Sequence, residues 1–336
     1  MSDGYRGIGH HGTSTFGNGP VKVAVLDDYQ DVALSLADWS PLHDLVHVTA
    51  FHDHQTDDDE VVARLEAFDI VVLMRERTPL RADRLARLGR LRSIVTTGMA
   101  NDAVDVVEAR RLGMEVQGTG GWAGVATTVE LTWGLILAAA RGIARQDAAI
   151  RSGGWQEGLG MGLAGRRLGI VGLGNLGSQM PPIGRAFGMD VVAWSQNMTA
   201  EHAAAAGATL LDRDSFFATS DVVSVHLKLG PRSVGYVGEA DLRRMKPTAV
   251  LVNTSRGPVV DEAALVRALE EGWIAAAGLD VFGHEPLPPD HPFRRLPNCV
   301  VSPHVGYVTQ DTYAQYYPQI VEDIESFLRG DPVRPI

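Results

Sequence analysis

Three polar side chains follow three predicted strands, each just beyond the point where the strand ends. Arg256 follows the apolar run AVLVN, Glu285 follows AAAGLD, and His304 follows CVVSP. Because the carboxyl ends of parallel strands meet at one edge of a sheet, the three side chains can converge on one crevice. An arginine there can hold a substrate carboxylate through a forked hydrogen bond, and a histidine can move a proton to or from an oxygen. A carboxylate can orient the imidazole and favour its protonated form.

Each of the three residues also has an ordinary structural interpretation. Arg256 can cap a helix or pair on the surface, Glu285 can be a loop charge, and His304 can be a hydrogen-bonded core histidine. Other histidines are weaker candidates, since they lie in polar runs or inside a predicted strand; these are His10, His11, His52, His54 and His226. We expect no metal site.

A glycine-rich stretch, LGIVGLGNLG, occupies Leu168–Gly177. A short apolar run precedes Gly172, Gly174 and Gly177, whose spacing is G-x-G-x-x-G, and a helix-like segment follows. The first glycine permits a tight turn, the second lets a pyrophosphate approach the backbone, and the third lets the helix pack close to the strand. The stretch predicts a dinucleotide-binding turn, with a turn that binds no ligand as the alternative. The N–H groups expected to face the phosphates are those of Asn175 and Leu176.

The kind of dinucleotide depends on the end of the next predicted strand, DVVAW. An acidic residue at this place usually binds the ribose 2′-OH and repels a 2′-phosphate. Ser195 stands here, and no arginine or lysine follows at the strand end. We therefore expect NAD and NADP both to be used, with a modest preference. The alternative is that another segment, such as the one bearing Arg213, supplies a cation and makes the protein strict for NADP(H).

Apolar runs alternate with helical patterns from Val21 onwards. The predicted strands of the first series are Val21–Leu26, Val46–Phe51, Asp69–Met74, Arg92–Thr96 and Met114–Gln117. The predicted helices between them lie near Ala33–Leu36, Glu60–Leu65, Ala82–Leu88 and Ala103–Leu112. The predicted strands of the second series are Leu168–Gly172, Asp190–Trp194, Asp221–Leu227, Ala249–Asn253, Ala275–Asp280 and Cys299–Ser302. Such alternation predicts an α/β fold with two doubly wound parallel sheets.

Four segments depart from this alternation. Residues 1–20 are polar and glycine-rich, which predicts a disordered tail. A glycine cluster at 118–121 precedes a long apolar helix predicted at Ala123–Ala144, so the cluster is a candidate hinge. Pro181–Pro182 fall where the helix after the glycine turn should continue, which predicts a kink. An amphipathic helix is predicted at Tyr313–Leu328, where it can return to pack on the first domain.

Composition narrows the classes of partner. The formal charge of −11 argues against nucleic acid and anionic membranes, because both bind basic surfaces. No apolar run reaches the ~18 residues of a membrane span, and no secretory signal is present, so we expect a cytoplasmic protein. The single cysteine, Cys299, fits a reducing compartment and lies in an apolar run, where a buried structural thiol is expected.

The chain from about Val21 to its C-terminus resembles the D-isomer-specific 2-hydroxyacid dehydrogenases. The resemblance rests on GLGNLG, DVVSVHL, MKPTAVLVNTSRGPVVD, AGLDVFGHEP and SPHVGY, in this order and spacing. It implies a Rossmann dinucleotide-binding domain at 120–304 inserted in a flavodoxin-like substrate-binding domain at 21–119 and 305–336. Members are usually homodimers through the cofactor domain, which suits the apolar helix near Leu131–Ala140.

The resemblance also implies roles for particular residues. Arg256, Glu285 and His304 would form the catalytic trio, and Asp280 would hold the nicotinamide carboxamide. Further residues expected to line the cofactor site are Leu227, Lys228, Thr254 and Ser255.

The loop TGMANDAVD at Thr97–Asp105 is similar to the family loop whose backbone N–H groups bind the substrate carboxylate. The expected donors are Gly98, Met99 and Ala100, although the family often has a second glycine where Ala100 stands. Three charged residues that follow the strand DIVVLM can contact the substrate or form a solvated loop; these are Arg75, Glu76 and Arg77.

These features predict an NAD(P)-dependent oxidoreductase that interconverts a D-2-hydroxy acid and its 2-oxoacid by hydride transfer, working as a 2-oxoacid reductase. Its partners would be a small 2-oxoacid or 2-hydroxyacid and a second copy of the chain. The alternative is a dinucleotide-sensing, corepressor-like binding protein with little turnover, because an intact catalytic trio is compatible with both.

Overall fold

The computed structural model describes residues 19–121 and 123–336. The predicted tail, apart from its last two residues, and the pair His10–His11 lie outside the described residues. The chain forms two compact units. One combines the described residues up to Gly121 with Gln310–Ile336, and the other runs from the helix that begins at Ala123 to Thr309.

The first unit is built on a five-stranded parallel sheet with the order β2-β1-β3-β4-β5. This is the flavodoxin-like order of a doubly wound sheet. Every residue of β3 and β4 is buried, as expected for strands covered on both faces. The strands are β1 (Val21–Val25), β2 (Val46–Ala50), β3 (Ile70–Leu73), β4 (Ser93–Thr96) and β5 (Glu115–Gly118). The helices between them are η1 (Ser40–Leu42), α1 (Asp58–Leu65), α2 (Ala82–Leu85) and α3 (Val106–Arg111).

One predicted helix of this unit, Ala33–Leu36, does not form. The buried carboxylate of Asp28 accepts the N–H groups of Val32 and Ala33, and Leu36 closes a single turn onto Val32. An aspartate that binds the backbone just after itself offers the chain an alternative to a helix, which explains the error.

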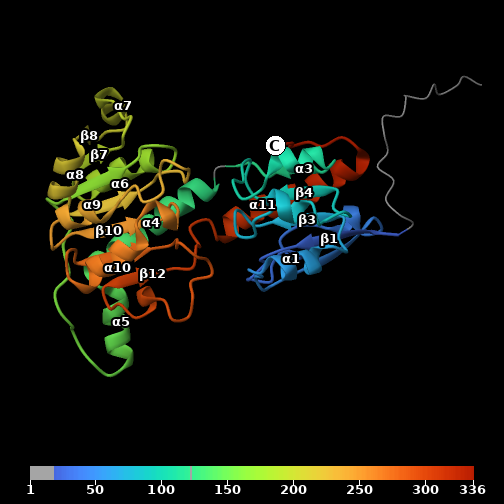
Figure 1. Ribbon diagram of the computed structural model, residues 1–336. Coiled ribbons are helices and arrows are strands. Elements are labelled where there is room, and N and C mark those ends of the chain that lie inside the picture. The colour runs from blue at the N-terminus through green and yellow to red at the C-terminus, as the bar shows by residue number, and fades with distance from the viewer. Residues whose placement is uncertain (1–18, 122) are drawn as a thin grey trace, which may run out of the picture. The chain divides into compact units, whose positions relative to one another are not determined.

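The last part of the chain completes the first unit. Helix α11 (Gln310–Arg329), in red beside β4 in Figure 1, packs on β4 and β5. Gln117 of β5 donates its side-chain amide to the carbonyl oxygen of Asp323 at 3.0 Å. The final residues then pair with the edge of β5, through an antiparallel bridge between Gln117 and Pro335 and a hydrogen bond from Ile336 N–H to the Val116 carbonyl.

The second unit is built on a seven-stranded parallel sheet with the order β12-β11-β10-β9-β6-β7-β8. This matches the predicted second doubly wound sheet, with one addition. The strand β8 (Thr209–Leu210) was missed because two residues carry no apolar pattern. The other strands are β6 (Arg167–Val171), β7 (Asp190–Trp194), β9 (Val222–Val225), β10 (Val250–Asn253), β11 (Ala276–Leu279) and β12 (Cys299–Val301).

The helices of the second unit cover both faces of its sheet. The long apolar helix α4 (Ala123–Arg141) packs on β10, β11 and β12. The remaining helices are α5 (Ile143–Arg151), η2 (Gly177–Gln179), α6 (Met180–Ala186), α7 (Ala200–Ala205), α8 (Arg213–Thr219), α9 (Glu239–Arg244), η3 (Gly257–Val259), α10 (Glu262–Glu270) and η4 (Pro292–Arg294). Within the described ranges, none of the helices is long and apolar enough to cross a bilayer.

Two predicted helices of this unit are divided. The segment Ala123–Ala144 breaks at Gly142, whose φ of 60° is left-handed and starts α5 in a new direction. The segment after the glycine turn begins as the 3₁₀ turn η2 and continues as α6, with Pro181 and Pro182 in the first turn of α6. A proline there removes no helical hydrogen bond, so the prolines start a helix and do not kink one, which corrects our expectation.

Candidate active site

The turn that carries Arg256 is shaped by the residue that ends β10. The side-chain oxygen of Asn253 accepts both the N–H and the hydroxyl of Ser255, at 3.0 and 2.9 Å. Its NH₂ group donates to the carbonyl oxygen of Arg256 at 3.0 Å. Because one buried amide satisfies three groups of the turn, the backbone of Arg256 is fixed. The Arg256 guanidinium donates to the Ser255 carbonyl oxygen at 2.6 Å.

The next residue brings this turn against the loop after β11. A Cβ on Gly257 would lie 1.9 Å from the carbonyl carbon of Phe282, so only glycine fits. The N–H of Phe282 in turn donates to the Glu285 carboxylate at 2.9 Å. The close approach thus places the Arg256 turn and the Glu285 loop side by side.

His304 and Glu285 form a direct pair. The imidazole Nδ1 lies 2.6 Å from a carboxylate oxygen of Glu285. The side chains are 16% and 31% exposed, so the pair is accessible from solvent yet partly desolvated. His304 has a left-handed φ of 53°, and its ring meets that of Tyr307 edge-on at 5.9 Å between centroids. The alternative of a core histidine is not supported, because the ring reaches the surface.

The charges around Glu285 act together. Burial has the largest single effect and raises the pKa of the Glu285 carboxyl, but its hydrogen bonds and the nearby positive charges together bring the pKa below its ordinary value, with His304 contributing most. The Phe282 N–H and the charge of Arg256 also lower the pKa. Glu285 is therefore a carboxylate over the neutral range, where it can accept a hydrogen bond from the imidazole.

Asp280, at the end of β11, holds the loop that carries His304. One carboxylate oxygen accepts the Ser302 hydroxyl at 2.6 Å and the Val305 N–H at 2.9 Å, and the other accepts the Gly306 N–H at 2.9 Å. Burial raises the pKa of Asp280, while these hydrogen bonds oppose the rise. A carboxylate has about four acceptor sites, and these bonds use three of them.

The glycine turn after β6 fits a dinucleotide pyrophosphate. Gly172 has a φ of 91°, and a Cβ on Gly177 would lie 2.0 Å from the Gly172 carbonyl oxygen, so both positions require glycine. A Cβ on Gly174 would meet nothing within 4 Å, which leaves open space above the turn. Asn175 beside it is exposed, and Leu176 is half-buried at the start of η2.

The other residues expected at the cofactor site lie around the same end of the sheet. The Leu227 side chain lies against Gly172, and the Lys228 carbonyl oxygen accepts the hydroxyl of Ser233. The Thr254 hydroxyl is 2.7 Å from that of Thr132 on α4. Ser195 is half-buried just after β7, where its carbonyl oxygen accepts the Met198 N–H.

The expected carboxylate loop lies at the carboxyl end of β4 in the first unit. Gly98 has a φ of 92°, and its N–H already donates to the Thr119 hydroxyl at 2.9 Å. Met99 and Ala100 are exposed, and their N–H groups have no hydrogen bond within the described part of the chain. Arg75 lies over the loop, where its guanidinium donates to the Thr97 carbonyl oxygen at 2.9 Å. The loop thus offers two backbone donors and not three.

The sequence did not reveal a polar cluster at the carboxyl end of β1. The buried Asp27 binds His54 at 2.7 Å and the Thr78 hydroxyl at 2.7 Å. His54 lies in a polar run, and no local pattern in the sequence relates residues so far apart in the chain. Oxygen and nitrogen atoms of Asp28, Asp31 and His52 also lie within 4.8 Å of one another, but Asp28 is already bonded to backbone N–H groups.

His226 and Cys299 are two further titratable groups whose pKa values are shifted by burial. Burial lowers the pKa of His226 to about 4, and its ring bonds the Ser224 hydroxyl at 2.8 Å. Burial raises the pKa of the Cys299 thiol to about 12, as expected for an inert thiol.

Known proteins are similar to this chain in sequence and in fold. A family model described as D-isomer specific 2-hydroxyacid dehydrogenase, NAD binding domain, matches residues 133–306. The glyoxylate reductase of Aeropyrum pernix is 40% identical over 274 residues, which cover 79% of this chain and 81% of that protein. The D-3-phosphoglycerate dehydrogenase of Archaeoglobus fulgidus is 33% identical over 278 residues, which cover 82% of this chain and 52% of that protein. The solved phosphoglycerate oxidoreductase of Vibrio cholerae o395 superimposes with a TM-score of 0.86 at 36% identity, covering 92% of this chain and 99% of the other.

Proposed function

We propose that Arg256, Glu285 and His304 catalyse the reduction of a 2-oxoacid. The chain belongs to the D-isomer specific 2-hydroxyacid dehydrogenase family. The chain is an NAD(P)-dependent 2-hydroxyacid dehydrogenase. The observation that carries the assignment of residues is the 2.6 Å contact between His304 Nδ1 and Glu285. This contact leaves the other ring nitrogen, Nε2, as the one that can exchange a proton with a substrate.

The side chains divide the work of reduction. Bound NAD(P)H supplies the hydride that adds to C2 of the 2-oxoacid. Protonated His304 gives its Nε2 proton to the oxygen that becomes the hydroxyl, and Glu285 stabilises the imidazolium until that transfer. Arg256 polarises the carbonyl and holds the carboxylate, since a guanidinium presents donors in a planar fork. In the oxidative direction neutral His304 accepts the hydroxyl proton.

The cofactor contacts follow from the glycine turn and the strand ends. The open space at Gly174 accommodates the pyrophosphate, with the N–H groups of Asn175 and Leu176 as donors. Asp280 would hold the nicotinamide carboxamide. Leu227, Lys228, Thr254 and Ser255 line the rest of the site. Because Ser195 carries no charge, both NAD(H) and NADP(H) are accepted.

The unit with the seven-stranded sheet binds the dinucleotide. In the unit with the five-stranded sheet, the exposed Met99 and Ala100 offer their N–H groups as the proposed donors to a carboxylate. The relatives named glyoxylate reductase favour a small 2-oxoacid as the substrate.

A panel of 2-oxoacids tests this function. Glyoxylate, hydroxypyruvate, pyruvate and phenylpyruvate are offered with NADH and with NADPH, cofactor oxidation is followed by absorbance, and the hydroxyacid is identified by chiral chromatography. We expect at least one substrate to turn over at on the order of 1–10³ per second and to give the D-hydroxyacid. Cofactor binding without turnover of any 2-oxoacid would contradict the proposal and favour the dinucleotide-sensing alternative.

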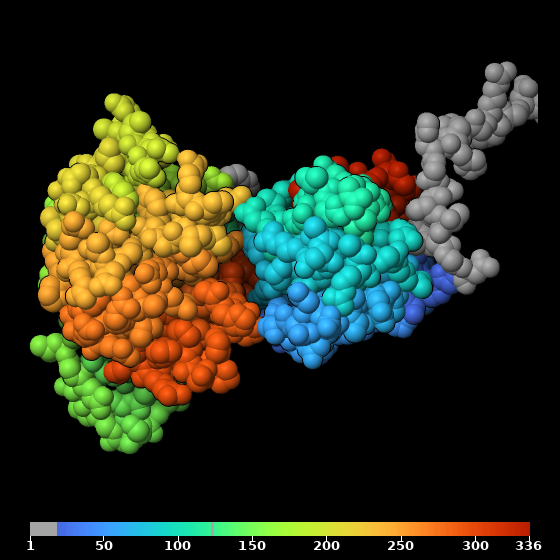
Figure 2. Space-filling model, in the orientation of Figure 1, coloured from blue at the N-terminus to red at the C-terminus, as the bar shows by residue number. Residues whose placement is uncertain are grey.

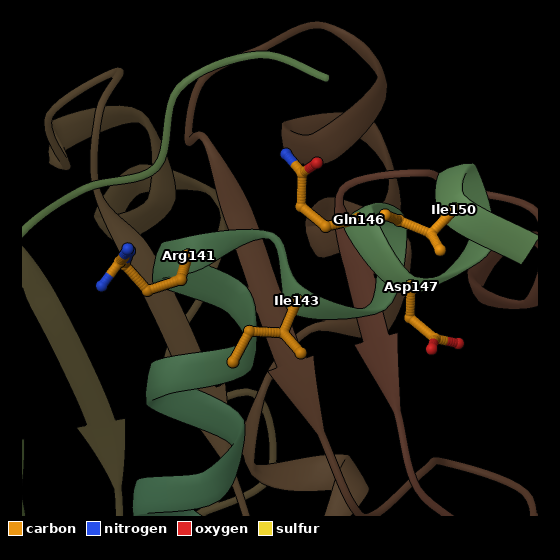
Figure 3. Close-up of a pocket in the computed structure, with 5 residues that line it drawn as sticks. All are labelled: Arg141, Ile143, Gln146, Asp147 and Ile150. Carbon is orange, nitrogen blue, oxygen red and sulfur yellow. The ribbon is translucent and has the colours of Figure 1, made fainter. Parts of the chain in front are cut away.

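A homodimer through the dinucleotide-binding unit is also part of the proposal. Helix α5 and the loop after it, in green, project from the body of their unit in Figure 2. Ile143 and Ile150 are each more than half exposed on α5, as are Trp155 and Leu159 on the loop. A pocket on this surface is lined by five residues, which Figure 3 labels: Arg141, Ile143, Gln146, Asp147 and Ile150. Apolar side chains gathered on one projecting surface are typical of a protein–protein interface.

Light scattering tests the oligomer. We expect the wild type to have the mass of two chains, and the double change Ile150→Glu with Leu159→Glu to give a single chain. A monomeric wild type would contradict this part of the proposal without bearing on turnover.

A further inference from the structure

The turn that ends β7 is joined to Arg213 through two aromatic rings. Trp194, the last residue of β7, stacks on Tyr236 with ring centroids 5.1 Å apart. The Tyr236 hydroxyl accepts the backbone N–H of Gln196 at 2.7 Å, so it holds the turn at Ser195. The Arg213 guanidinium lies 4.9 Å from the Trp194 ring and donates to the Tyr236 carbonyl oxygen at 2.9 Å. A cation is therefore fixed beside the turn.

The partner of this cation is buried. Arg213 donates to both oxygens of Asp241, from Nε at 2.8 Å and from Nη2 at 2.7 Å. The Asp241 side chain is 2% exposed, whereas that of Arg213 is 44% exposed. An anion that approaches from solvent thus meets the positive member of the pair first. Asp214, next to Arg213 in the chain, binds Arg244 at 3.2 Å.

The orientation of the guanidinium leaves donors available. Asp241 and the Tyr236 carbonyl occupy Nε and Nη2. The Nη1 group makes no hydrogen bond to the residues that the structure describes. Asp241 and the Trp194 ring hold the guanidinium in place, so a ligand at Nη1 binds a preorganised cation.

We propose that Arg213 binds the 2′-phosphate of NADP(H) and gives the protein a preference for NADP(H) over NAD(H). In a doubly wound sheet the ribose 2′ position lies at the end of the second strand of the dinucleotide fold, which is β7 here. Ser195, which replaces the usual acid, removes the repulsion of a phosphate, and Arg213 supplies the charge-assisted hydrogen bond that Ser195 cannot. This inference rests on the proposed dinucleotide site.

Binding of nucleotide fragments tests the proposal apart from turnover. Isothermal titration compares adenosine 2′,5′-bisphosphate with adenosine 5′-monophosphate, which lacks the 2′-phosphate. We expect the wild type to bind the bisphosphate at least tenfold more tightly. The double change Arg213→Gln with Asp241→Asn removes the cation without leaving a buried charge unpaired, and it should reduce that ratio to about one. In Arg213→Lys the ammonium group cannot bind both oxygens of Asp241 and a phosphate at once. This variant should therefore keep only a small part of the preference for the bisphosphate.

A matched control removes a cation elsewhere in the same unit. Lys246 binds the buried Asp221 at 2.9 Å, at the amino ends of β9 and β10, opposite the cofactor. Lys246→Gln should leave the ratio unchanged. Equal affinity of the wild type for the two fragments, or a ratio that survives the double change, would overturn the proposal. Turnover of a 2-oxoacid with NADH but not with NADPH would also overturn the proposal, and it would leave the proposed function intact. Absence of turnover with both cofactors would reject the proposed function itself.

Discussion

Gly257 touches the main chain of Phe282 so closely that a Cβ would lie 1.9 Å from the Phe282 carbonyl carbon. The contact joins the strand end that bears Arg256 to the loop that bears Glu285, and through Glu285 to His304. The spacing of the catalytic groups thus depends on the absence of one methyl group.

Gly257→Ala should therefore reduce turnover more than cofactor binding. The methyl group forces two backbone segments apart, at a cost of about 1–3 kcal/mol, which lowers the melting temperature by roughly 2–12 °C. We expect a fall in kcat of tenfold or more with a nearly unchanged Kd for the cofactor. Gly162→Ala is the control, because a Cβ there meets nothing within 4 Å. Equal effects of the two changes would contradict this account.

His304→Ala should remove most turnover while cofactor binding survives. The general acid is lost, which costs on the order of 10² to 10⁴ in rate. Steady-state kinetics gives kcat, and fluorescence titration of NAD(P)H gives the Kd. Near wild-type turnover would rule out His304 as the proton donor.

Glu285→Gln should move the pH dependence of reduction. The pKa of Glu285 lies below its ordinary value, so the carboxylate is present throughout the neutral range. Reduction requires a protonated imidazole, and the change to glutamine removes the negative charge that lies 2.6 Å from its Nδ1. The alkaline limb of kcat/KM should shift down by on the order of one pH unit. An alkaline limb at the wild-type pH would show that Glu285 only positions the ring.

Arg256→Lys should behave almost like Arg256→Ala. A guanidinium that contacts both the carboxylate and the carbonyl acts in the ground state and in the transition state, so both changes raise KM and lower kcat. Lysine keeps the charge but lacks the fork. Recovery of wild-type kinetics in the lysine variant would mean that charge alone matters.

Asp323→Asn should flatten the pH dependence of stability. Burial raises the pKa of Asp323 from 3.8 to about 7, although Arg334 at 2.9 Å opposes the rise. The folded chain then holds a proton that the unfolded chain releases near pH 4. Stability falls as the pH rises from about 4 to 7, by on the order of 2–4 kcal/mol at most. Melting temperatures from pH 5 to 8 should decline less in the variant; parallel declines would contradict the assignment.

The sequence predicted the parallel sheets well because buried strands are long apolar runs. The errors lie where one side chain or two residues decide the local structure. Asp28 closes a turn that reads as a helix, Gly142 divides an apolar helix, and β8 is too short to show a pattern. The sequence places Pro181 and Pro182 in a helical segment, but it does not show that a new helix, α6, starts just before them.

The site could be predicted only in part. Strand ends identified Arg256, Glu285 and His304, since topology brings them to one edge of the sheet. The Gly98 N–H donates to the hydroxyl of Thr119, which lies just after β5, and no local pattern in the sequence indicates this bond. The position of Arg213 beside Trp194 likewise depends on the packing of α8, which the sequence does not specify.

Helix α11 belongs to the first unit, although the whole second unit separates it from that unit in the chain. During synthesis the five strands of the first sheet emerge early, but the helix that covers β4 and β5 follows roughly 190 residues later, which at about 5–20 residues per second is a delay of about 10–40 s. The uninterrupted second unit can complete its core before the first. Until α11 has been made, the surface of β4 and β5 that it covers in the folded unit stays uncovered in the nascent chain.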